Sequence, residues 1–502
     1  MVAPAPPGAA GGRIVRPAHG GQRRWLVLVV VVGVLAGLAI AARSPGQSAP
    51  GGPPPAPGSL VGAPDGESSA WYCTGQSTAA GQLAPGSIIL TNSGTRTVKG
   101  MIDAVTDTGA TVATPVAVPA RRQLVPDIPT PKSGTWISEA VTLSGGGVAV
   151  SQTLQGSSGW AEAPCLSSTA QQWYFPSGVT TGSNALFVSL FNPTATPDVV
   201  DLSFTTSKGV VHPINFQGIV LQPGQTQVES IGPFVQDQGS IATTVSTRTG
   251  RLVAGELQLL TGNGSGLAIV PGSPRVEREW VIPRAVEVSG GSSSIDVFNP
   301  GPTAEEVTIR TALGSGPLAP FRARVPADST WVLSTSAETR IPIGDPYSAV
   351  VESTGGPGVV VGRAVAAPSS APAPQEGLAT AVDVLSAATP THMWVVPSPG
   401  LAATPVVPGA FPAHLTLTNL TDHQETYVLD VVEASGLKSI ATGDLPPSGS
   451  FSLSSPALGG AGLDPVLVRT NGSAAVSEDV GPTGSDGVVT MPGVPLSRAI
   501  GG

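Results

Sequence analysis

The sequence repeats itself four times after residue 70, and this repetition limits the possible folds more than any other feature. Each copy opens with a tryptophan at the start of a short apolar segment, and successive copies begin about 102, 107 and 114 residues apart. This spacing is close to the ~100 residues of an immunoglobulin-type β-sandwich. The opening tryptophans are Trp71, Trp173, Trp280 and Trp394.

A second landmark recurs in register with the first. In each copy an apolar strand ends in asparagine, and the strands of the last two copies alternate apolar and polar residues. Such alternation is typical of a strand with one face on a core and one in solvent, and asparagine ends the strand because its side chain can close a turn. The strands are residues 88–92, 188–192, 295–299 and 415–419.

Each copy then passes through glycine- and proline-containing turns and ends in a longer apolar strand. No segment after residue 70 has a helical period, so the sequence predicts an all-β fold of tandem immunoglobulin-like β-sandwich domains. A β-propeller is the less favoured alternative, because propeller blades repeat about every 40 to 50 residues. The predicted sandwiches are residues 70–170, 171–277, 278–390 and 391–498.

The composition agrees with an ordered chain that does not bind nucleic acid. Gly 64 and Pro 51 are abundant, but 40% of the residues are hydrophobic, which is too many for a disordered chain. The net charge of −9 excludes a nucleic-acid partner, which requires clustered cations. Arginine far exceeds lysine among the cations, and alanine, glycine, proline and valine dominate the rest, which favours an actinobacterial origin.

An apolar segment at residues 25–42 precedes the repeats and is long enough, at about 27 Å as a helix, to span a bilayer. Four arginines precede it, so the positive-inside rule predicts a signal anchor with a cytoplasmic tail at residues 1–24. A Pro/Gly-rich linker at residues 43–69 would follow it. The predicted localisation is a single-pass cell-membrane protein with an extracytoplasmic C-terminal bulk. A cleaved signal peptide is the alternative, because Ala39-Ile40-Ala41 has the small-x-small form of a cleavage site.

The repeat motifs resemble those of a family of actinobacterial, membrane-anchored envelope proteins of unknown function. The resemblance rests on the W-x-F-P strand at residues 173–176 and the N-P turn at residues 192–193, and it extends over roughly residues 70–495. Members of that family are commonly encoded beside a family-2 glycosyltransferase, which implies a link to envelope glycan assembly. The resemblance implies no catalytic residues.

Cys73 and Cys165 are the two cysteines, and they bracket the first copy. Both would lie in an oxidising envelope, so we predict a structural disulfide between them. Its closure of a loop of roughly 90 residues would stabilise the fold by up to about 4 to 5 kcal/mol in the chain-entropy model. A catalytic thiol is the weaker interpretation, because no histidine lies in the first copy to serve as its base.

No metal or cofactor site is predicted. His392, His414 and His423 share one copy, and Asp422 or Glu425 could add a fourth zinc ligand, but their spacing matches no zinc motif. We interpret these histidines as solvated surface residues.

Four carboxylates near the copy-ending strands raise the possibility of glycoside hydrolysis, which needs two acidic groups facing a sugar. Carboxylates in such strands are more often outward-facing and solubilising, so no catalytic residue is assigned. The four are Glu256, Glu352, Glu478 and Asp479.

The tryptophans are the best candidates for ligand contact, because aromatic rings stack on sugars and anchor protein partners. A tryptophan at the same register in every copy more plausibly fills a core. Trp160 and Trp331 fall outside that register and are predicted as ligand contacts at the surface.

These observations predict a non-enzymatic scaffold or accessory protein of the cell envelope. The expected partners are the cytoplasmic membrane, through the N-terminal helix, and an envelope protein such as a membrane glycosyltransferase. A cell-wall polysaccharide-binding module is the alternative, and an envelope glycoside hydrolase is the third.

Overall fold

The computed structural model describes most of the chain after residue 68. Every described residue belongs to one compact unit, within Pro57–Gly502. The predicted tail at 1–24, membrane segment at 25–42 and nearly all of the linker at 43–69 lie outside the described residues. The described residues are 69–78, 83–129, 131, 133–156, 159–261, 266–287, 289–366, 382–384, 392–397, 413–454, 464–480 and 489–495.

The localisation predicted from the N-terminal segment is corrected. Among the described residues, no helix has both the length and the apolar character needed to cross a membrane. The single-pass membrane localisation with an extracytoplasmic bulk is therefore not retained. The helical turn η1 (Ile214–Phe216) is three residues long.

Each copy forms two antiparallel sheets, named A and B with the number of the copy, and the opening tryptophan lies in sheet A. Sheet 1A has the order β1 (Ser69–Ser77), β6 (Trp136–Leu143), β3 (Val98–Thr106), β4 (Thr111–Val118). Sheet 2A has the order β12 (Gly209–Val211), β11 (Asp198–Thr206), β15 (Ile241–Thr249), β9 (Gln172–Phe175), with β13 (Ile219–Leu221) also on β11. Sheet 3A has the order β18 (Glu279–Val286), β24 (Pro346–Thr354), β20 (Glu305–Leu313), β21 (Gly316–Pro317), with β22 (Phe321–Val325) also on β20. Sheet 4A has the order β30 (Gly436–Leu445), β29 (Glu425–Glu433), β32 (Val466–Thr470), β27 (Met393–Val396), β35 (Val494–Pro495).

The B sheets contain the strand that ends in asparagine and the copy-ending strand as direct neighbours. Sheet 1B has the order β5 (Arg122–Leu124), β2 (Gly86–Asn92), β7 (Val148–Gly156), β8 (Gly159–Pro164). Sheet 2B has the order β14 (Thr226–Ser230), β10 (Ala185–Phe191), β16 (Val253–Leu260), β17 (Gly266–Pro271). Sheet 3B has the order β23 (Ser329–Ser334), β19 (Ser292–Asn299), β25 (Val360–Ala366), β26 (Val382–Val384). Sheet 4B has the order β31 (Ser450–Ser454), β28 (Ala413–Asn419), β33 (Ala474–Val480), β34 (Val489–Pro492).

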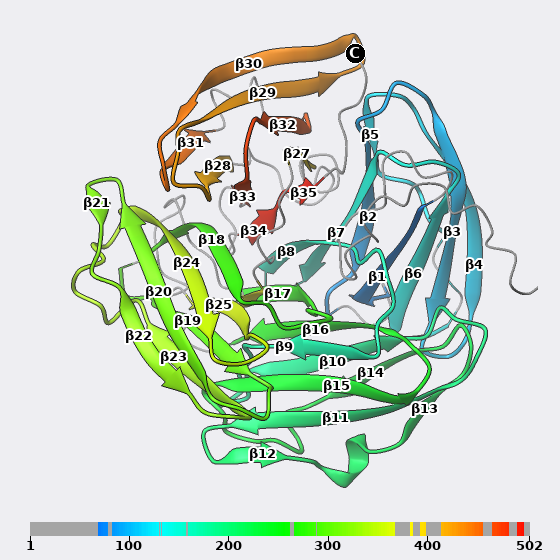
Figure 1. The fold of residues 1–502 in the computed structure, drawn as a ribbon. Helices are drawn as coiled ribbons and strands as arrows, with labels where there is room; N and C mark the ends of the chain where they lie inside the picture. Colours follow the sequence, from blue (N-terminus) through cyan, green and yellow to red (C-terminus); the bar gives the residue numbers. More distant parts are fainter. Residues whose placement is uncertain are drawn as a thin grey trace, which may run out of the picture. The chain divides into compact units, whose positions relative to one another are not determined.

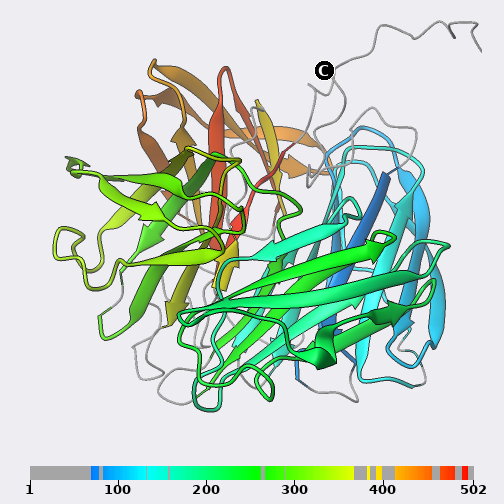
Figure 2. The ribbon, with the colours of Figure 1, turned by 60° about the horizontal axis from the view of Figure 1, so that its bottom comes forward.

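The eight sheets are arranged as the blades of an eight-bladed β-propeller (Figure 1). Neighbouring sheets follow one another in the order 1A, 1B, 4A, 4B, 3A, 3B, 2A, 2B, and sheet 2B returns to sheet 1A. The B sheets point their last strands inward, where β8 packs against β17 and β34, and β17 against β26. Figure 2 shows the same succession of sheets after a turn of the view.

Contacts between copies close the propeller at four places. Trp136 of sheet 1A packs on Phe187 of sheet 2B, with ring centroids 5.3 Å apart. Tyr174 of sheet 2A packs on Phe298 of sheet 3B at 6.3 Å. The remaining two joints are the Arg284–Asp479 ion pair between sheets 3A and 4B, and an apolar cluster in which Val432 and Leu467 of sheet 4A join the core of copy 1.

The predicted tandem immunoglobulin-like sandwiches are therefore wrong. The four copies exist, but each copy supplies two blades, so a spacing of about 105 residues corresponds to roughly 50 residues per blade, which suits a propeller. The alternation of apolar and polar residues in strands 295–299 and 415–419 did not indicate a solvent-exposed face. The face that carries the polar residues is also buried, because it packs against the neighbouring copy. Asp296, Thr416 and Thr418 are each no more than 3% exposed, and the Thr418 hydroxyl donates to the Pro283 carbonyl of copy 3 at 3.2 Å. The residue limits predicted for the copies remain predictions.

The opening tryptophans fill the cores, as the sequence favoured. All four are at most 4% exposed. Trp173 Nε1 donates to the Leu252 carbonyl at 3.0 Å, and Trp280 Nε1 donates to the Val359 carbonyl at 2.8 Å, across 79 residues in both copies. These bonds tie sheet A to the strand of sheet B that follows the accepting residue, so Trp173 and Trp280 satisfy their indole N–H groups while burying a large apolar ring.

The predicted disulfide between Cys73 and Cys165 is confirmed. Cys73 lies in β1 of sheet 1A, and Cys165 follows β8, the innermost strand of sheet 1B. The bond therefore links the two blades of copy 1 and joins two residues that are 92 positions apart in the sequence.

The recurrent asparagine joins three parts of its copy. Asn299 Nδ2 donates to the Thr303, Val325 and Pro326 carbonyls at 2.8, 3.1 and 3.0 Å, while its Oδ1 accepts from the Gly301 N–H at 2.9 Å. The turn closure expected from the sequence is present, and the side chain also binds the end of a distant strand. Corresponding bonds are made by Asn92, Asn192 and Asn419.

We predict that Asn299→Ala lowers the free energy of unfolding by about 2 to 3 kcal/mol, because buried carbonyls lose their donor. Urea denaturation of the full chain measures the change. Asn215→Ala is the control, since Asn215 is exposed on η1, and it should change the stability by less than about 0.5 kcal/mol. Equal stability of the two variants would contradict a stabilising role for the hydrogen bonds of Asn299.

Candidate functional site

One register position carries a polar side chain in every copy. In each copy, the apolar residue four positions before the recurrent asparagine pairs with a polar residue of the copy-ending strand. These polar residues, in copies 1 to 4, are Gln152, Glu256, Arg363 and Glu478. All four are at most 5% exposed, which corrects the expectation that carboxylates in these strands face outward. They are buried because each sheet is covered on both faces.

Burial dominates the chemistry of these carboxyl groups. It raises the pKa of Glu478 to about 8, and Asp479 beside it adds to the rise. It also raises the pKa of Glu256 well above its usual range, although the Thr243 hydroxyl donates to Glu256 Oε2 at 3.2 Å and opposes the rise. The Glu478 carboxyl group is therefore largely protonated at neutral pH, and burial favours the protonated form of Glu256.

The sequence interpretation missed Glu162. This residue lies in β8 at the centre of the propeller, accepts a hydrogen bond from Ser151 at 3.1 Å, and is buried. Burial and the nearby Glu478 carboxyl raise its pKa well above the usual range, so residues from the first and last copies meet here. The only signal in the sequence is a single glutamate within an otherwise apolar strand.

The four carboxylates considered for hydrolysis do not form an accessible pair. Glu256 and Glu478 are buried in different copies, and Asp479 is held by Arg284 at 2.6 Å. Glu352 lies at the surface of sheet 3A, where it accepts from Arg310 Nη2 at 2.5 Å. A glycosidase needs both carboxyl groups beside one sugar, and this arrangement does not provide it.

The two tryptophans predicted to contact a ligand have different environments. Trp160 is only 2% exposed and lies in β8 within an apolar cluster that also contains Leu267 and Ile269 of β17, so its ring is a core residue rather than a surface contact. Trp331 lies in β23, half-buried against the core. Its role in ligand contact stays a prediction.

The histidines considered for zinc do not assemble a metal site in the described part of the chain. His423 lies 3.2 Å from Asp422 and 3.5 Å from Glu425, but His392 and His414 do not join them. No group of three potential ligands that could hold a metal occurs among the described residues.

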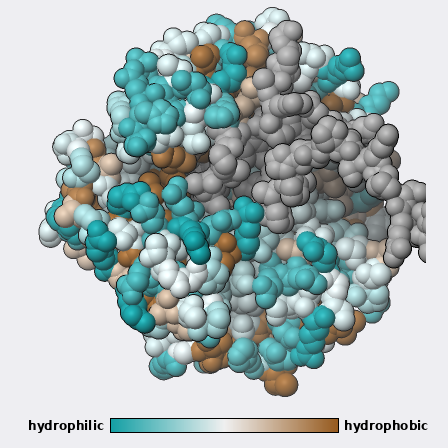
Figure 3. Space-filling model, viewed as in Figure 1, coloured by the Kyte–Doolittle hydropathy of each residue, from teal (hydrophilic) through white to brown (hydrophobic). Residues whose placement is uncertain are grey.

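An exposed apolar surface on copy 2 is the strongest candidate for function. We name it the copy-2 apolar edge, and it consists of Val210, Val211, Ile214, Val220 and Phe234. Ile214 is 82% exposed and Phe234 is 48% exposed. Figure 3 shows hydrophobic colour at the lower margin of the molecule, where Figure 1 draws β12 and the helical turn η1.

The local sequence explains why these side chains remain outside. β12 ends before Pro213, which cannot donate a ladder hydrogen bond, and η1 then turns the chain toward β13. Phe216 is buried below this turn and packs on Phe204 at 5.5 Å and on Phe234 at 5.0 Å. The core therefore anchors the turn, while Ile214 projects away from it.

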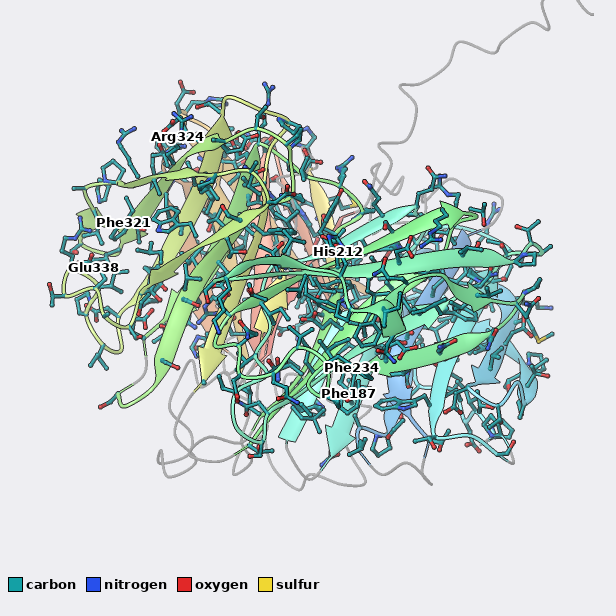
Figure 4. All side chains as sticks on the ribbon, turned by 90° about the horizontal axis from the view of Figure 1, so that it is seen from below. Phe187, His212, Phe234, Phe321, Arg324 and Glu338 are labelled. Carbon is teal, nitrogen blue, oxygen red and sulfur yellow. A yellow bond between two sulfur atoms is a disulfide. The ribbon has the colours of Figure 1, made fainter. Side chains whose placement is uncertain are left out.

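Polar groups beside the copy-2 apolar edge hold its backbone in place, and the charged groups among them are paired with each other. The Gly218 N–H donates to Asp201 Oδ1 at 2.7 Å, and Arg248 forms a two-point ion pair with the same carboxylate. Arg248 holds the pKa of Asp201 below its usual value. His212, which Figure 4 labels together with Phe234, is exposed beside β12.

Comparison with known proteins gives limited information. The model of a "Family of unknown function (DUF5719)" matches residues 138–340, which include the copy-2 apolar edge. This match agrees with a resemblance to an uncharacterised family, over a shorter range than 70–495, and it tests neither the actinobacterial origin nor the motifs. No curated protein matches the chain.

One solved structure is similar over most of its length. It is the crystal structure of a tetra-tandem repeat in the extending region of a large adhesion protein. The identity is 13%, over 81% of this chain and 93% of that chain, with a TM-score of 0.12. So low a TM-score assigns no fold to this chain.

We predict that the protein loses stability as the pH rises from about 4.5 to about 8. The folded state raises the carboxyl pKa values of Glu139 and Glu478 to about 8 and of Asp296 to about 6, mainly through burial. The folded state therefore binds more protons than the unfolded chain in this range, and each titrating carboxyl lowers the free energy of unfolding by as much as about 1.4 kcal/mol per pH unit. Urea denaturation at pH 5, 6.5 and 8 measures the slope.

Glu478→Gln tests the assignment, because the amide replaces the protonated form. This variant should match the original protein at pH 5 and exceed it in stability at pH 8. Glu306→Gln is the control, since Glu306 is exposed and should not alter the slope. A Glu478→Gln slope as steep as that of the original protein would rule out the buried carboxyl as a source.

Proposed function

We propose that this chain is a non-catalytic scaffold of the cell envelope, and that the copy-2 apolar edge is the place where a partner protein docks. The concentration of exposed apolar side chains carries the proposal. Of the nine large apolar side chains that are exposed among the described residues, five belong to this edge. Single exposed apolar residues need no explanation, but a gathered set marks an interaction surface.

The chemistry of the edge favours a protein partner. Valine, isoleucine and phenylalanine side chains form no hydrogen bonds. A partner protein that covers them removes apolar surface from water, which stabilises the complex. Phe216 holds the turn rigidly from below, so little conformational freedom is lost on docking.

The finer assignment of compartment and partner rests on other observations. The Cys73–Cys165 disulfide supports an oxidising compartment such as the envelope. The resemblance to envelope proteins encoded beside a glycosyltransferase supports such an enzyme as the partner.

A cell-wall polysaccharide-binding module is less well supported at this edge. A polysaccharide chain is commonly held by exposed aromatic rings that stack on the faces of its sugars. Of the two tryptophans predicted for that role, Trp160 is in the core and Trp331 is half-buried.

We predict that Ile214→Asp weakens binding to the partner by at least about tenfold, because docking would remove the new carboxylate from water and bury it in an apolar contact. A cross-linking pull-down of the tagged full-length chain identifies the partner, and titration calorimetry with the purified partner gives the dissociation constant.

Ile343→Asp is the matched control, since Ile343 is 66% exposed in copy 3, away from the copy-2 apolar edge. Both variants should unfold at the same temperature as the original protein. Equal binding by the two variants, or recovery of no specific partner, would refute docking at this edge.

A further inference from the structure

A second surface feature lies at the joint where the last copy meets the first. It is a groove of about 270 Å³ between sheet 1B and sheet 4A, which we name the seam groove. Its volume suits one small molecule rather than a peptide or a protein. The groove is lined by Arg121, Arg122, Gln123, Val432, Glu433, Ala434, Asp464 and Pro465.

Arg121 has a backbone conformation that its residue type disfavours. Its φ of +52° lies in the left-handed region, where a side chain clashes with its own backbone. The turn before the first strand of sheet B has a left-handed residue in each copy, and copies 2, 3 and 4 use Gly224, Asp328 and Ser448. Copy 1 alone among them places a long cationic side chain there, and observed strain of this kind is a reason to look for function.

The Arg121 side chain crosses the joint. Its Nη1 lies so close to Gly436 of β30 that a Cβ added to that glycine would stand 3.3 Å away. The guanidinium of copy 1 therefore rests against the backbone of copy 4, and the small residue in β30 leaves room for it.

The two arginines of the groove have no ionic partner within the part of the chain that the structure describes. Neither Arg121 nor Arg122 forms an ion pair with a carboxylate of the described residues, whereas Arg248, Arg284 and Arg469 do. The carboxylates of the groove lie on the opposite wall. Glu433 there is 3.6 Å from the Lys438 ammonium group, which offsets its charge, so the two arginines face one carboxylate without a cationic partner among the described residues, that of Asp464.

We propose that the seam groove binds a small sugar that carries an oxyanion, either a phosphate or a carboxylate. Arg121 and Arg122 supply forked N–H donors for the anion. Gln123 and Asp464 line the same groove and can bond to the hydroxyl groups of the sugar. Because the ligand touches both copies, binding also stabilises the closed propeller.

The experiment uses the full-length chain and three probes: α-D-glucose 1-phosphate, D-glucuronate and D-glucose. Titration calorimetry at low ionic strength should show saturable binding of one or both anionic sugars and at least tenfold weaker binding of glucose. Tighter binding of the phosphate or of the carboxylate identifies the anion that the groove prefers. The bound probe should also raise the unfolding temperature.

Arg121→Gly separates a loss of binding from a loss of folding. Glycine adopts a positive φ without strain, so this variant should be at least as stable as the original protein while binding the anionic sugars at least tenfold more weakly. Arg122→Gln should also bind more weakly. Arg324→Gln is the control, since Arg324 is an exposed arginine of β22, and it should bind as the original protein does.

Failure of all three probes to bind, or equal binding by Arg121→Gly, would overturn the proposal. The seam groove and the copy-2 apolar edge are separate, so Ile214→Asp should leave probe binding unchanged. The two proposals can therefore fail independently.

Discussion

The packing of every sheet between two others is the constraint on which the rest of this structure depends. An antiparallel sheet ordinarily turns one face to water, and its strands then alternate apolar and polar residues. Here the second face is covered by another copy, so polar side chains on that face must find partners inside the protein. The Arg284–Asp479 ion pair and the Thr418–Pro283 hydrogen bond are two such solutions, and both lie between copies 3 and 4.

The same constraint explains the unusual state of the buried carboxyl groups. Glu162, Glu256 and Glu478 are covered by apolar strands and have few donors, so burial raises their pKa values and favours their protonated forms. Raised pKa values often mark catalytic groups, but an acid that no substrate can reach does not act on one. In this protein they follow from the closed arrangement of the sheets.

Much of the local structure could be predicted from the sequence, but the arrangement of the sheets could not. The tryptophan and asparagine landmarks predicted the four copies and the buried tryptophans, and the two cysteines predicted the disulfide, because each depends on interactions within one copy. Asp296 and Thr416 were interpreted as solvent-facing, since a polar residue at a packed joint and one in water look alike in a sequence. The copy-2 apolar edge was not predicted, because an isoleucine or valine such as Ile214 or Val220 looks the same in a sequence whether it is buried or exposed. Arg121 gave no signal except its place in a turn where copy 2 has glycine.

The order of the copies around the propeller determines how the chain completes itself. Copy 1 touches copies 2 and 4, so the faces left open by copies 1 to 3 are covered only when copy 4 arrives. Of the four copies, copy 4 is the last to be synthesised. Until then sheet 1B and sheet 3A each present a face that is shaped for copy 4, and the copy 4 of a neighbouring molecule can fill it as well. Insertion of copy 4 into its own propeller would give a closed monomer, whereas insertion into a neighbouring one would join molecules head to tail.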